Sequence, residues 1–182
     1  DAMCDTPIVR ILFYYSEWQP LYREFVDSRI EFHEGLPKTT DFADDKRPKI
    51  AIIDDLMREA GDGTITNLFT RVSHHHSLSI MFLSQNLFHH GQREISLNCG
   101  YLVIFKNPRD QSSISHLARQ VYPENSQFVR EAYQDATREP HSYLLLDLRQ
   151  DTPDNCRFRA CIFPTDDHQF VYVPRKKKKS SG

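Results

Sequence analysis

Two short apolar segments, each followed at once by polar side chains, constrain the fold of this chain most strongly. The first, residues 49–53, reads Lys-Ile-Ala-Ile-Ile and runs into Asp54 and Asp55. The second, residues 79–83, reads Ser-Ile-Met-Phe-Leu and runs into a Ser-Gln pair. An apolar run without polar alternation is typical of a strand buried on both faces, as in the parallel sheets of α/β proteins. The sequence therefore predicts an α/β fold with a mainly parallel sheet.

The carboxyl ends of these two strands carry the side chains with the clearest chemistry. Ligands gather at this edge of a parallel sheet, where the two aspartates should meet Ser84 and Gln85. A magnesium ion takes one or two protein carboxylates and completes its shell with water and phosphate oxygens, as Asp54 would allow. Asp55 suits the positioning or activation of an attacking water, and Gln85 suits a sensor of the γ-phosphate. An Asp-Asp pair after a strand is also common as the cap of a following turn or helix.

Six segments, in this order and spacing, carry a resemblance to a known family: Ile-Asp-Asp-Leu-Met at 53–57, Leu-Phe-Thr at 68–70, Ser-His-His at 73–75, Leu-Ser-Gln-Asn-Leu-Phe at 83–88, Phe-Lys-Asn-Pro-Arg-Asp at 105–110 and Tyr-Leu-Leu-Leu-Asp at 143–147. Together they resemble the FtsK/HerA superfamily of DNA-translocating ATPases. More narrowly, they resemble the A32-like genome-packaging ATPases of Polinton/Maverick transposons and related viruses. The first segment looks like the Walker B strand of that family.

The resemblance implies a fold, cofactors and partners. The fold is an α/β three-layer sandwich around a P-loop NTPase core of the ASCE type, and the cofactors are ATP and Mg²⁺. The protein would act as a homo-oligomeric ring that pulls double-stranded DNA through its pore, with a capsid or portal component as a further partner. Residues 1–174 would form the NTPase domain from the Walker B strand onward, and residues 175–182 a basic flexible tail.

The resemblance also implies roles for individual residues. Asp54 would hold Mg²⁺ directly or through water, and Ser84 would contact the nucleotide. Arg71 and Arg109 become candidates for an arginine that acts across a subunit boundary. Arg71 is also read as an ordinary cation at a helix C-terminus. Arg109 is the better candidate of the two, although the adjacent Asp110 is a simple ion-pair partner for it.

One departure from the family matters more than these matches. The sequence contains no G-x-x-x-x-G-K-[ST] segment, and its six glycines offer no substitute phosphate cradle. In the family, the strand that feeds this loop lies between the strands represented here by residues 79–84 and 101–105. We therefore expect an NTPase core that lacks its first strand and P-loop, either as an N-terminally truncated piece or as a decayed copy.

Periodicity and turn residues predict the remaining elements. Pro20 predicts a short helix with proline in its first turn, and Thr64 or Thr66 a helix N-cap. The composition turns polar from residue 30 to residue 48, and residues 34–37 and 41–48 are predicted to form a loop that leads into the strand at 49–53. The other expected elements are strands at 9–15 and 101–105, helices at 110–122 and from Asn125 or Ser126, and a hairpin formed by 143–148 and 157–163.

Composition limits the function classes. The formal net charge of −2 and the isoelectric point near 6.5 give no global basic signal, so a nucleic-acid contact would need a local patch. The four cysteines form no CxxC pair, and no apolar run reaches the length of a membrane span, so an intracellular protein without membrane contact is expected. The lysine run at 176–179 fits a nuclear localisation signal, a phosphate contact or a solvated end equally well. Nuclear and virion-associated locations both stay open.

Three functions from different classes fit these observations. The first is the C-terminal portion of an ATP-dependent DNA-packaging motor. The second is a catalytically inactive, exapted or decayed ATPase-like domain that only binds protein or DNA. A two-metal nuclease built on Asp54, Asp55 and a third acid ranks below both, because a Ser-Gln pair follows the adjacent strand and no other acidic cluster stands at a strand end. Metal binding by His74, His75 and His76 is disfavoured, since consecutive side chains diverge.

Overall fold

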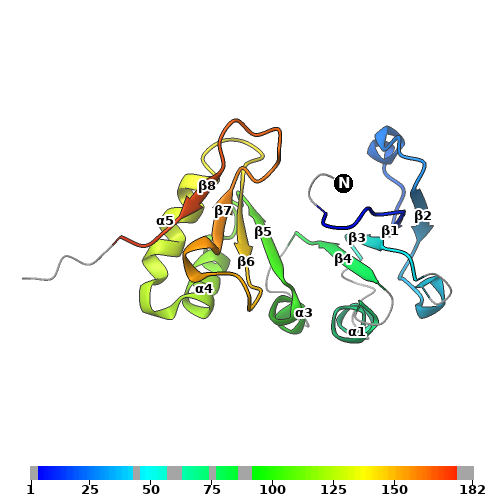
Figure 1. The fold of residues 1–182 in the computed structure, drawn as a ribbon, viewed down its shortest axis with the longest axis horizontal. Coiled ribbons are helices and arrows are strands. Elements are labelled where there is room, and N and C mark those ends of the chain that lie inside the picture. Colours follow the sequence, from blue (N-terminus) through cyan, green and yellow to red (C-terminus); the bar gives the residue numbers. More distant parts are fainter. Residues whose placement is uncertain (1–3, 43–45, 57–62, 74–76, 86–91, 176–182) are drawn as a thin grey trace, which may run out of the picture. The chain divides into compact units, whose positions relative to one another are not determined.

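Two separate four-stranded sheets, one parallel and one antiparallel, make up the fold (Figure 1). The structure is a computed structural model that describes residues 4–42, 46–56, 63–73, 77–85 and 92–175, without the side chains of residues 92–94. The chain divides into two compact units, Asp1–Asn98 and Cys99–Gly182. Each unit contains one of the sheets.

The first unit contains the parallel sheet that the apolar segments predict. Its strands are β1 (Arg10–Tyr15), β2 (Ile30–Glu34), β3 (Lys49–Asp54) and β4 (Leu78–Leu83), in the order β2-β1-β3-β4. All three pairings are parallel. The coarse expectation of an α/β fold with a parallel sheet is therefore confirmed for this unit.

Apolar side chains on one face of this sheet form the core of the first unit. The short helical segments α1 (Thr64–Asn67) and η4 (Leu68–Val72), the latter a π-helical turn, supply Ile65, Leu68 and Val72 to it. The strands supply Leu12, Ala51 and other buried residues. Helix α3 (Gln92–Asn98) contributes the half-buried Ile95 at its rim.

The sequence missed one strand of the first unit and misplaced one helix cap. Residues 30–34 form strand β2, in which Ile30 and Phe32 alternate with Glu31, which faces solvent, and with His33, which stacks on Tyr14. Neither Thr64 nor Thr66 caps the helix after β3. The N-cap is Gly63, whose φ of 82° lies in the left-handed region that glycine adopts without strain. The short helix at Pro20 is present as the 3₁₀ turn η1 (Pro20–Glu24), and a second 3₁₀ turn is η2 (Thr39–Phe42).

The second unit has a different sheet from the one predicted. Its strands, β5 (Tyr101–Phe105), β6 (Tyr143–Asp147), β7 (Phe158–Ala160) and β8 (Phe170–Tyr172), run antiparallel in sequence order. The expected β6–β7 hairpin is confirmed. The expectation that β5 belongs to a mainly parallel sheet is wrong for the described residues, because the strand with which β5 pairs, β6, runs antiparallel to it.

Two amphipathic helices cover one face of the antiparallel sheet (Figure 1). Helix α4 (Gln111–Val121) begins at Asp110, whose carboxylate accepts a hydrogen bond from the Ser113 amide. Helix α5 (Ser126–Ala136) begins at Asn125, whose side chain accepts from the Phe128 amide, as predicted. The ring of Phe128 packs edge-on against Phe158 of β7 at 5.2 Å. The 3₁₀ turns η5 (Pro123–Asn125) and η6 (Asp154–Cys156) complete the unit.

Each sheet has an apolar strand at one edge. In the first unit, β4 pairs only with β3 among the described strands, and its Met81 and Leu83 are exposed. In the second unit, β5 pairs only with β6 among the described strands. Its Tyr101, Val103 and Phe105 share one face and are each about half exposed, at 48 to 55%. Edge strands of soluble proteins usually carry charges or proline to prevent further pairing, and these two strands carry neither.

Candidate functional site

The predicted site residues of the first unit meet at the carboxyl ends of β3 and β4. Asp54 and Leu83 are the last residues of these strands and lie opposite each other in the register. Asp55, Ser84 and Gln85 follow at the same edge. The parallel register therefore places these four polar residues at one sheet edge, as the sequence predicts, and a described hydrogen bond joins Gln85 to Asp55.

Asp54 is anchored by a tyrosine from another segment. The hydroxyl of Tyr22 in η1 donates a hydrogen bond to Oδ2 of Asp54 at 2.7 Å. The Tyr22 side chain is buried, whereas Asp54 is half-buried. Burial raises the pKa of Tyr22 above its ordinary value, and the hydrogen bond to Asp54 and the negative charges of both aspartates raise it further. Tyr22 therefore remains a protonated hydrogen-bond donor at neutral pH.

An aromatic cluster holds Tyr22 in this position. Its ring centroid lies 4.9 Å from that of Phe13 in β1 and 5.5 Å from that of Trp18, which meets it edge-on. Phe32 of β2 stacks on it at 6.0 Å. Nothing in the sequence singled out Tyr22 as a partner of Asp54. The one indication was the position of Tyr22 just after a strand whose end lies at the same sheet edge as Asp54.

Asp55 turns away from the regular strand geometry. Its backbone φ is 52°, in the left-handed region that residues other than glycine seldom occupy. Its exposed carboxylate accepts a long hydrogen bond, 3.4 Å, from Nε2 of Gln85. Asp54 and Asp55 thus have different surroundings, since the first contacts a buried phenol and the second contacts an amide at the surface.

The donor set at this edge fits a hard cation such as Mg²⁺. Carboxylate, amide and hydroxyl oxygens are the ligands that this ion prefers, and Asp54, Asp55, Ser84 and Gln85 supply them. No group of three or more histidine, cysteine, aspartate or glutamate side chains that could hold a metal occurs in the part of the chain that the structure describes. A cation here would therefore need oxygen ligands from water or from a bound phosphate, as is usual for Mg²⁺.

The two candidate arginines lie in different units. Arg71 is exposed and lies on the π-helical turn η4, a backbone irregularity that is frequent at functional sites. Arg109 is exposed just after β5 in the second unit, where its backbone amide donates to Asn107. The carboxylate of Asp110 accepts hydrogen bonds from Ser112 and Ser113 as the cap of α4. The described contacts of Asp110 are therefore with these two serines, and an ion pair with Arg109, the alternative role, is not among them.

Several sequence predictions fall on residues outside the described part of the chain. These are the histidines at 74–76, the Asn-Leu-Phe end of the segment 83–88 and the lysine run at 176–179. The four cysteines are free thiols. No helix within the described residues is long and apolar enough to cross a membrane.

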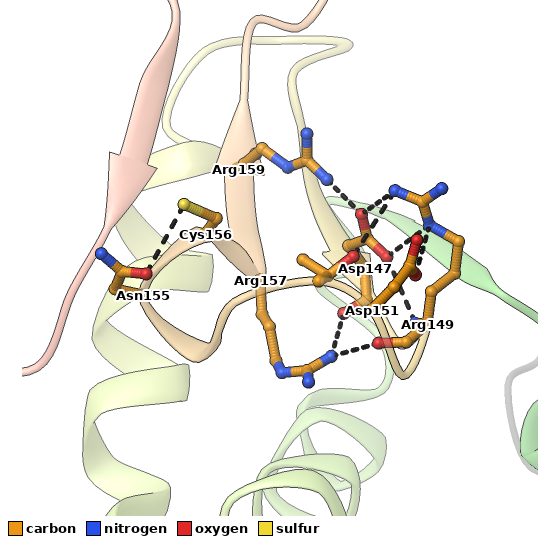
Figure 2. Close-up of polar contacts among 8 residues, drawn as sticks. Asp147, Arg149, Asp151, Asn155, Cys156, Arg157 and Arg159 are labelled. Carbon is orange, nitrogen blue, oxygen red and sulfur yellow. Dashed lines mark hydrogen bonds and ion pairs between the residues drawn. The ribbon is translucent and has the colours of Figure 1, made fainter.

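The most extensive polar cluster of the second unit was not predicted. Asp147, at the end of β6, is fully buried and accepts hydrogen bonds from Arg149 and Arg159 (Figure 2). Arg157 donates to the backbone carbonyls of Asp147 and Arg149, which ties the connecting loop to β7. Burial would raise the pKa of Asp147, but its hydrogen bonds, led by those from Arg149 and Thr152, lower it overall.

This cluster is structural rather than a ligand site. The positive charges of its arginines are matched by Asp147 and by the exposed carboxylates of Asp151 and Asp154. The sequence signal for it was a single acid at the end of the apolar run Tyr-Leu-Leu-Leu-Asp, followed by three arginines within twelve residues.

Comparison with known proteins adds no family to this geometry. No protein-family model, no curated protein and no solved structure matches the chain. The functional argument therefore depends on the residues and contacts described above, together with the resemblance carried by the six sequence segments.

Proposed function

We propose that this chain is the C-terminal portion of an ATP-dependent, DNA-translocating motor of the packaging type. The observation that carries the proposal is the meeting of Asp54, Asp55 and Gln85 at the carboxyl ends of two adjacent parallel strands, with Gln85 in contact with Asp55. This edge is where α/β sheets bind ligands. Its side chains are also those that nucleotide hydrolysis needs: a carboxylate for the cation and polar groups for the attacking water.

The proposed division of work follows the different surroundings of the two aspartates. Asp54, held by Tyr22, binds Mg²⁺ directly or through water, and Ser84 contacts the nucleotide. When bound, Mg²⁺ would neutralise phosphate charge. Asp55 is exposed and points toward Gln85, so it is free to orient or deprotonate a water molecule. Gln85, hydrogen-bonded to Asp55, links that position to the γ-phosphate.

The finer fold that we propose is a P-loop NTPase core of the ASCE type, arranged as a three-layer sandwich. That core needs a strand and a phosphate-binding loop, and the motif for the loop is absent from these 182 residues. The apolar outer edges of β4 and of β5 support a requirement for further strand pairing, because central strands have this composition and edge strands do not. We propose that a further segment of the complete protein supplies the strand and loop.

The partners follow from the same proposal. Double-stranded DNA is the substrate of translocation, a homo-oligomeric ring is the working assembly, and a capsid or portal component is a candidate docking partner. Arg109, or alternatively Arg71, supplies a positive charge across a subunit boundary. The expected location of the protein is intracellular, in the nucleus or in a virion.

A substitution at Asp55 tests the proposal. In the complete protein, Asp55→Asn keeps the size and the hydrogen-bonding capacity of the side chain but removes its charge. We expect DNA-stimulated ATP hydrolysis to fall by at least about 100-fold, the usual contribution of a positioned base. Asp151→Asn, at an acid that is likewise exposed, is the matched control and should leave the rate unchanged. An unchanged rate in Asp55→Asn removes Asp55 from the mechanism.

The second candidate is an inactive domain that binds a partner through its exposed apolar strands. The absence of the phosphate-binding motif and the exposed side chains of β4 and β5 favour it for the chain as it stands. The two candidates differ in one simple observation. A ligand that prefers the native state raises the melting temperature of the protein. Mg-ATP should therefore raise the melting temperature of the complete protein if it is a motor, and leave it unchanged if the domain is inactive.

A further inference from the structure

The hydrogen bond between Tyr22 and Asp54 joins two segments that are distant in sequence. Tyr22 lies in η1, after β1, and Asp54 is the last residue of β3. At 2.7 Å the bond has the length of a strong interaction between a hydroxyl and a carboxylate. It engages Oδ2 of Asp54, and within the described residues no hydrogen bond reaches Oδ1.

The donor is held rigidly, because its ring is packed on several sides. Phe13, Trp18, Phe25 and Phe32 all lie within 6.0 Å of the Tyr22 ring, measured between centroids. A phenol fixed in this way restricts the rotation of the carboxylate that it bonds. Outer partners of this kind orient metal-binding side chains in many proteins and are part of the site's affinity.

We propose that Tyr22 is a positioning residue for Asp54: by holding Oδ2, it leaves Oδ1 as the oxygen that binds Mg²⁺. This inference rests on the proposed function, because it assumes that Asp54 is the cation ligand. If Tyr22 has this role, the geometry of the cation site depends on the packing of the aromatic cluster around η1. Trp18, an exposed member of that cluster, is the single tryptophan of the chain.

The position of Trp18 allows a direct test of cation binding that does not depend on ATP hydrolysis. Its ring lies 5.5 Å from that of Tyr22, so a lanthanide bound at Asp54 would lie close to the indole. Terbium(III) prefers the same hard oxygen ligands as Mg²⁺, and its emission rises when a nearby indole transfers excitation energy to it. The wild-type protein is titrated with Tb³⁺ under indole excitation, and Mg²⁺ is then added as a competitor.

Three variants make the titration specific. We expect Tyr22→Phe, which keeps the packed ring but removes the hydroxyl, to raise the Tb³⁺ concentration at half-saturation by about tenfold. Asp54→Asn should abolish saturable emission. Tyr14→Phe is the matched control, because it removes another phenol-carboxylate hydrogen bond from the same unit, the 2.9 Å bond from Tyr14 to Asp41, and should leave the midpoint unchanged.

The outcomes separate the inference from the function on which it rests. If wild type and Tyr22→Phe have the same midpoint while Asp54→Asn binds no Tb³⁺, the role of Tyr22 is overturned and the cation site stands. If wild type shows no saturable emission, or Asp54→Asn behaves like wild type, the cation site itself is overturned and the role of Tyr22 with it.

A second measurement does not depend on the folding of a variant at Tyr22. In wild type, cation binding at Asp54 should perturb the ultraviolet absorption of Tyr22, with the same midpoint as the terbium emission. A tyrosine difference spectrum with that midpoint, absent from Asp54→Asn, supports the inference. Saturable terbium emission without any tyrosine perturbation overturns it.

Discussion

The side-chain amide of Gln85 lies 3.4 Å from the carboxylate of Asp55, although thirty residues separate them in sequence. The contact follows from the register of β3 and β4, which places Asp54 opposite Leu83 and so brings the two strand ends level. As a long hydrogen bond between exposed groups, it contributes little to stability. Its importance is that two functional groups from different strands reach the same point in space.

Asp55 should be replaceable by glycine without loss of stability. Its φ of 52° is strained for most side chains and unstrained for glycine. We expect Asp55→Gly to keep or raise the free energy of unfolding, and Asp55→Val to lower it by about 1 to 2 kcal/mol. Urea denaturation of the two variants and wild type measures both effects.

His141 provides the control for this prediction. It is another exposed residue with positive φ, 64°, in the second unit, and it has no proposed catalytic role. Glycine should be tolerated at both positions, but only Asp55→Gly should abolish hydrolysis in the complete protein. Equal activity of the two glycine variants would show that hydrolysis does not need the carboxylate of Asp55.

Asp147 should make the second unit sensitive to acid. Burial raises the pKa of Asp147, but the hydrogen bonds from Arg149 and Thr152 lower it overall in the folded state, so the unfolded chain binds a proton more readily. The stability from this carboxylate is fully present above its unfolded pKa of about 3.9 and is lost as the pH falls further. Urea unfolding at several pH values, followed by circular dichroism, measures this loss.

Removing the charge at Asp147 isolates its contribution. We expect Asp147→Asn to lower the free energy of unfolding by about 2 to 3 kcal/mol at neutral pH, as for a buried carboxylate that accepts charged hydrogen bonds. The variant should also show a weaker dependence on pH below about 4. Asp154→Asn is the control, since the carboxylate of Asp154 is 91% exposed and should matter little. Equal pH profiles for Asp147→Asn and wild type would contradict this account of the cluster.

Arg109 should matter for hydrolysis and not for stability. Its side chain is exposed, and the neighbouring Asp110 is already engaged with Ser112 and Ser113. Arg109→Ala should therefore leave the melting temperature unchanged, while DNA-stimulated hydrolysis in the complete protein falls by about 10³-fold, as for other arginines that act in trans. Arg71→Ala should have a much smaller effect on hydrolysis.

Mixed assemblies test whether Arg109 acts across a subunit boundary. Arg109→Ala subunits retain Asp55, and Asp55→Asn subunits retain Arg109, so a mixture contains some interfaces with both groups. Activity should reappear on mixing the two inactive proteins. If the mixture stays inactive although the subunits exchange, Arg109 does not act in trans.

The exposed edge of β5 should promote self-association of this chain. Val103 is 48% exposed at the centre of an uncharged strand whose outer edge has no described partner. Val103→Lys should keep the protein monomeric up to a higher protein concentration than wild type, because a charged side chain disfavours pairing at a strand edge. Sedimentation velocity measures the effect, and the melting temperature of Val103→Lys should stay close to that of wild type.

Leu145 is the control for the lysine substitution. It lies opposite Val103 in the register and on the same face, but it is buried. Leu145→Lys should destabilise the second unit strongly, since it buries an unpaired charge. Self-association that is identical in Val103→Lys and wild type would show that the β5 edge is not the adhesive surface.

The sequence predicted the parts of the fold that local patterns determine. Strands β3 and β4 were predictable because continuous apolar runs of this length are typical of parallel strands. The expected burial on both faces does not hold for β4, whose Met81 and Leu83 are exposed. Helix α5 was predictable because Asn125 caps it and its buried stripe has helical spacing. Strand β2 was missed, since its alternating polar residues resemble a loop when the partner strand is unknown.

Long-range pairing explains the remaining errors. The run Tyr101–Phe105 has the composition of a parallel strand, but its direction is decided by its pairing with β6, about forty residues later in the chain. The role of Tyr22 was likewise missed, because its position after β1 indicates the sheet edge but not the carboxylate to which it donates a hydrogen bond. The edge formed by Asp54, Asp55 and Gln85 was predictable because strand ends in a parallel sheet share a direction.

The most direct test of the central claim is the melting temperature of the complete protein with ATP, measured with and without Mg²⁺. At a ligand concentration of about 100 times Kd, binding stabilises the native state by about 2.7 kcal/mol, which raises the melting temperature of a domain of this size by about 5 to 10 °C. Our account predicts this rise with Mg-ATP and its loss in Asp54→Asn. No rise in the wild-type protein, or the same rise in Asp54→Asn, would contradict it.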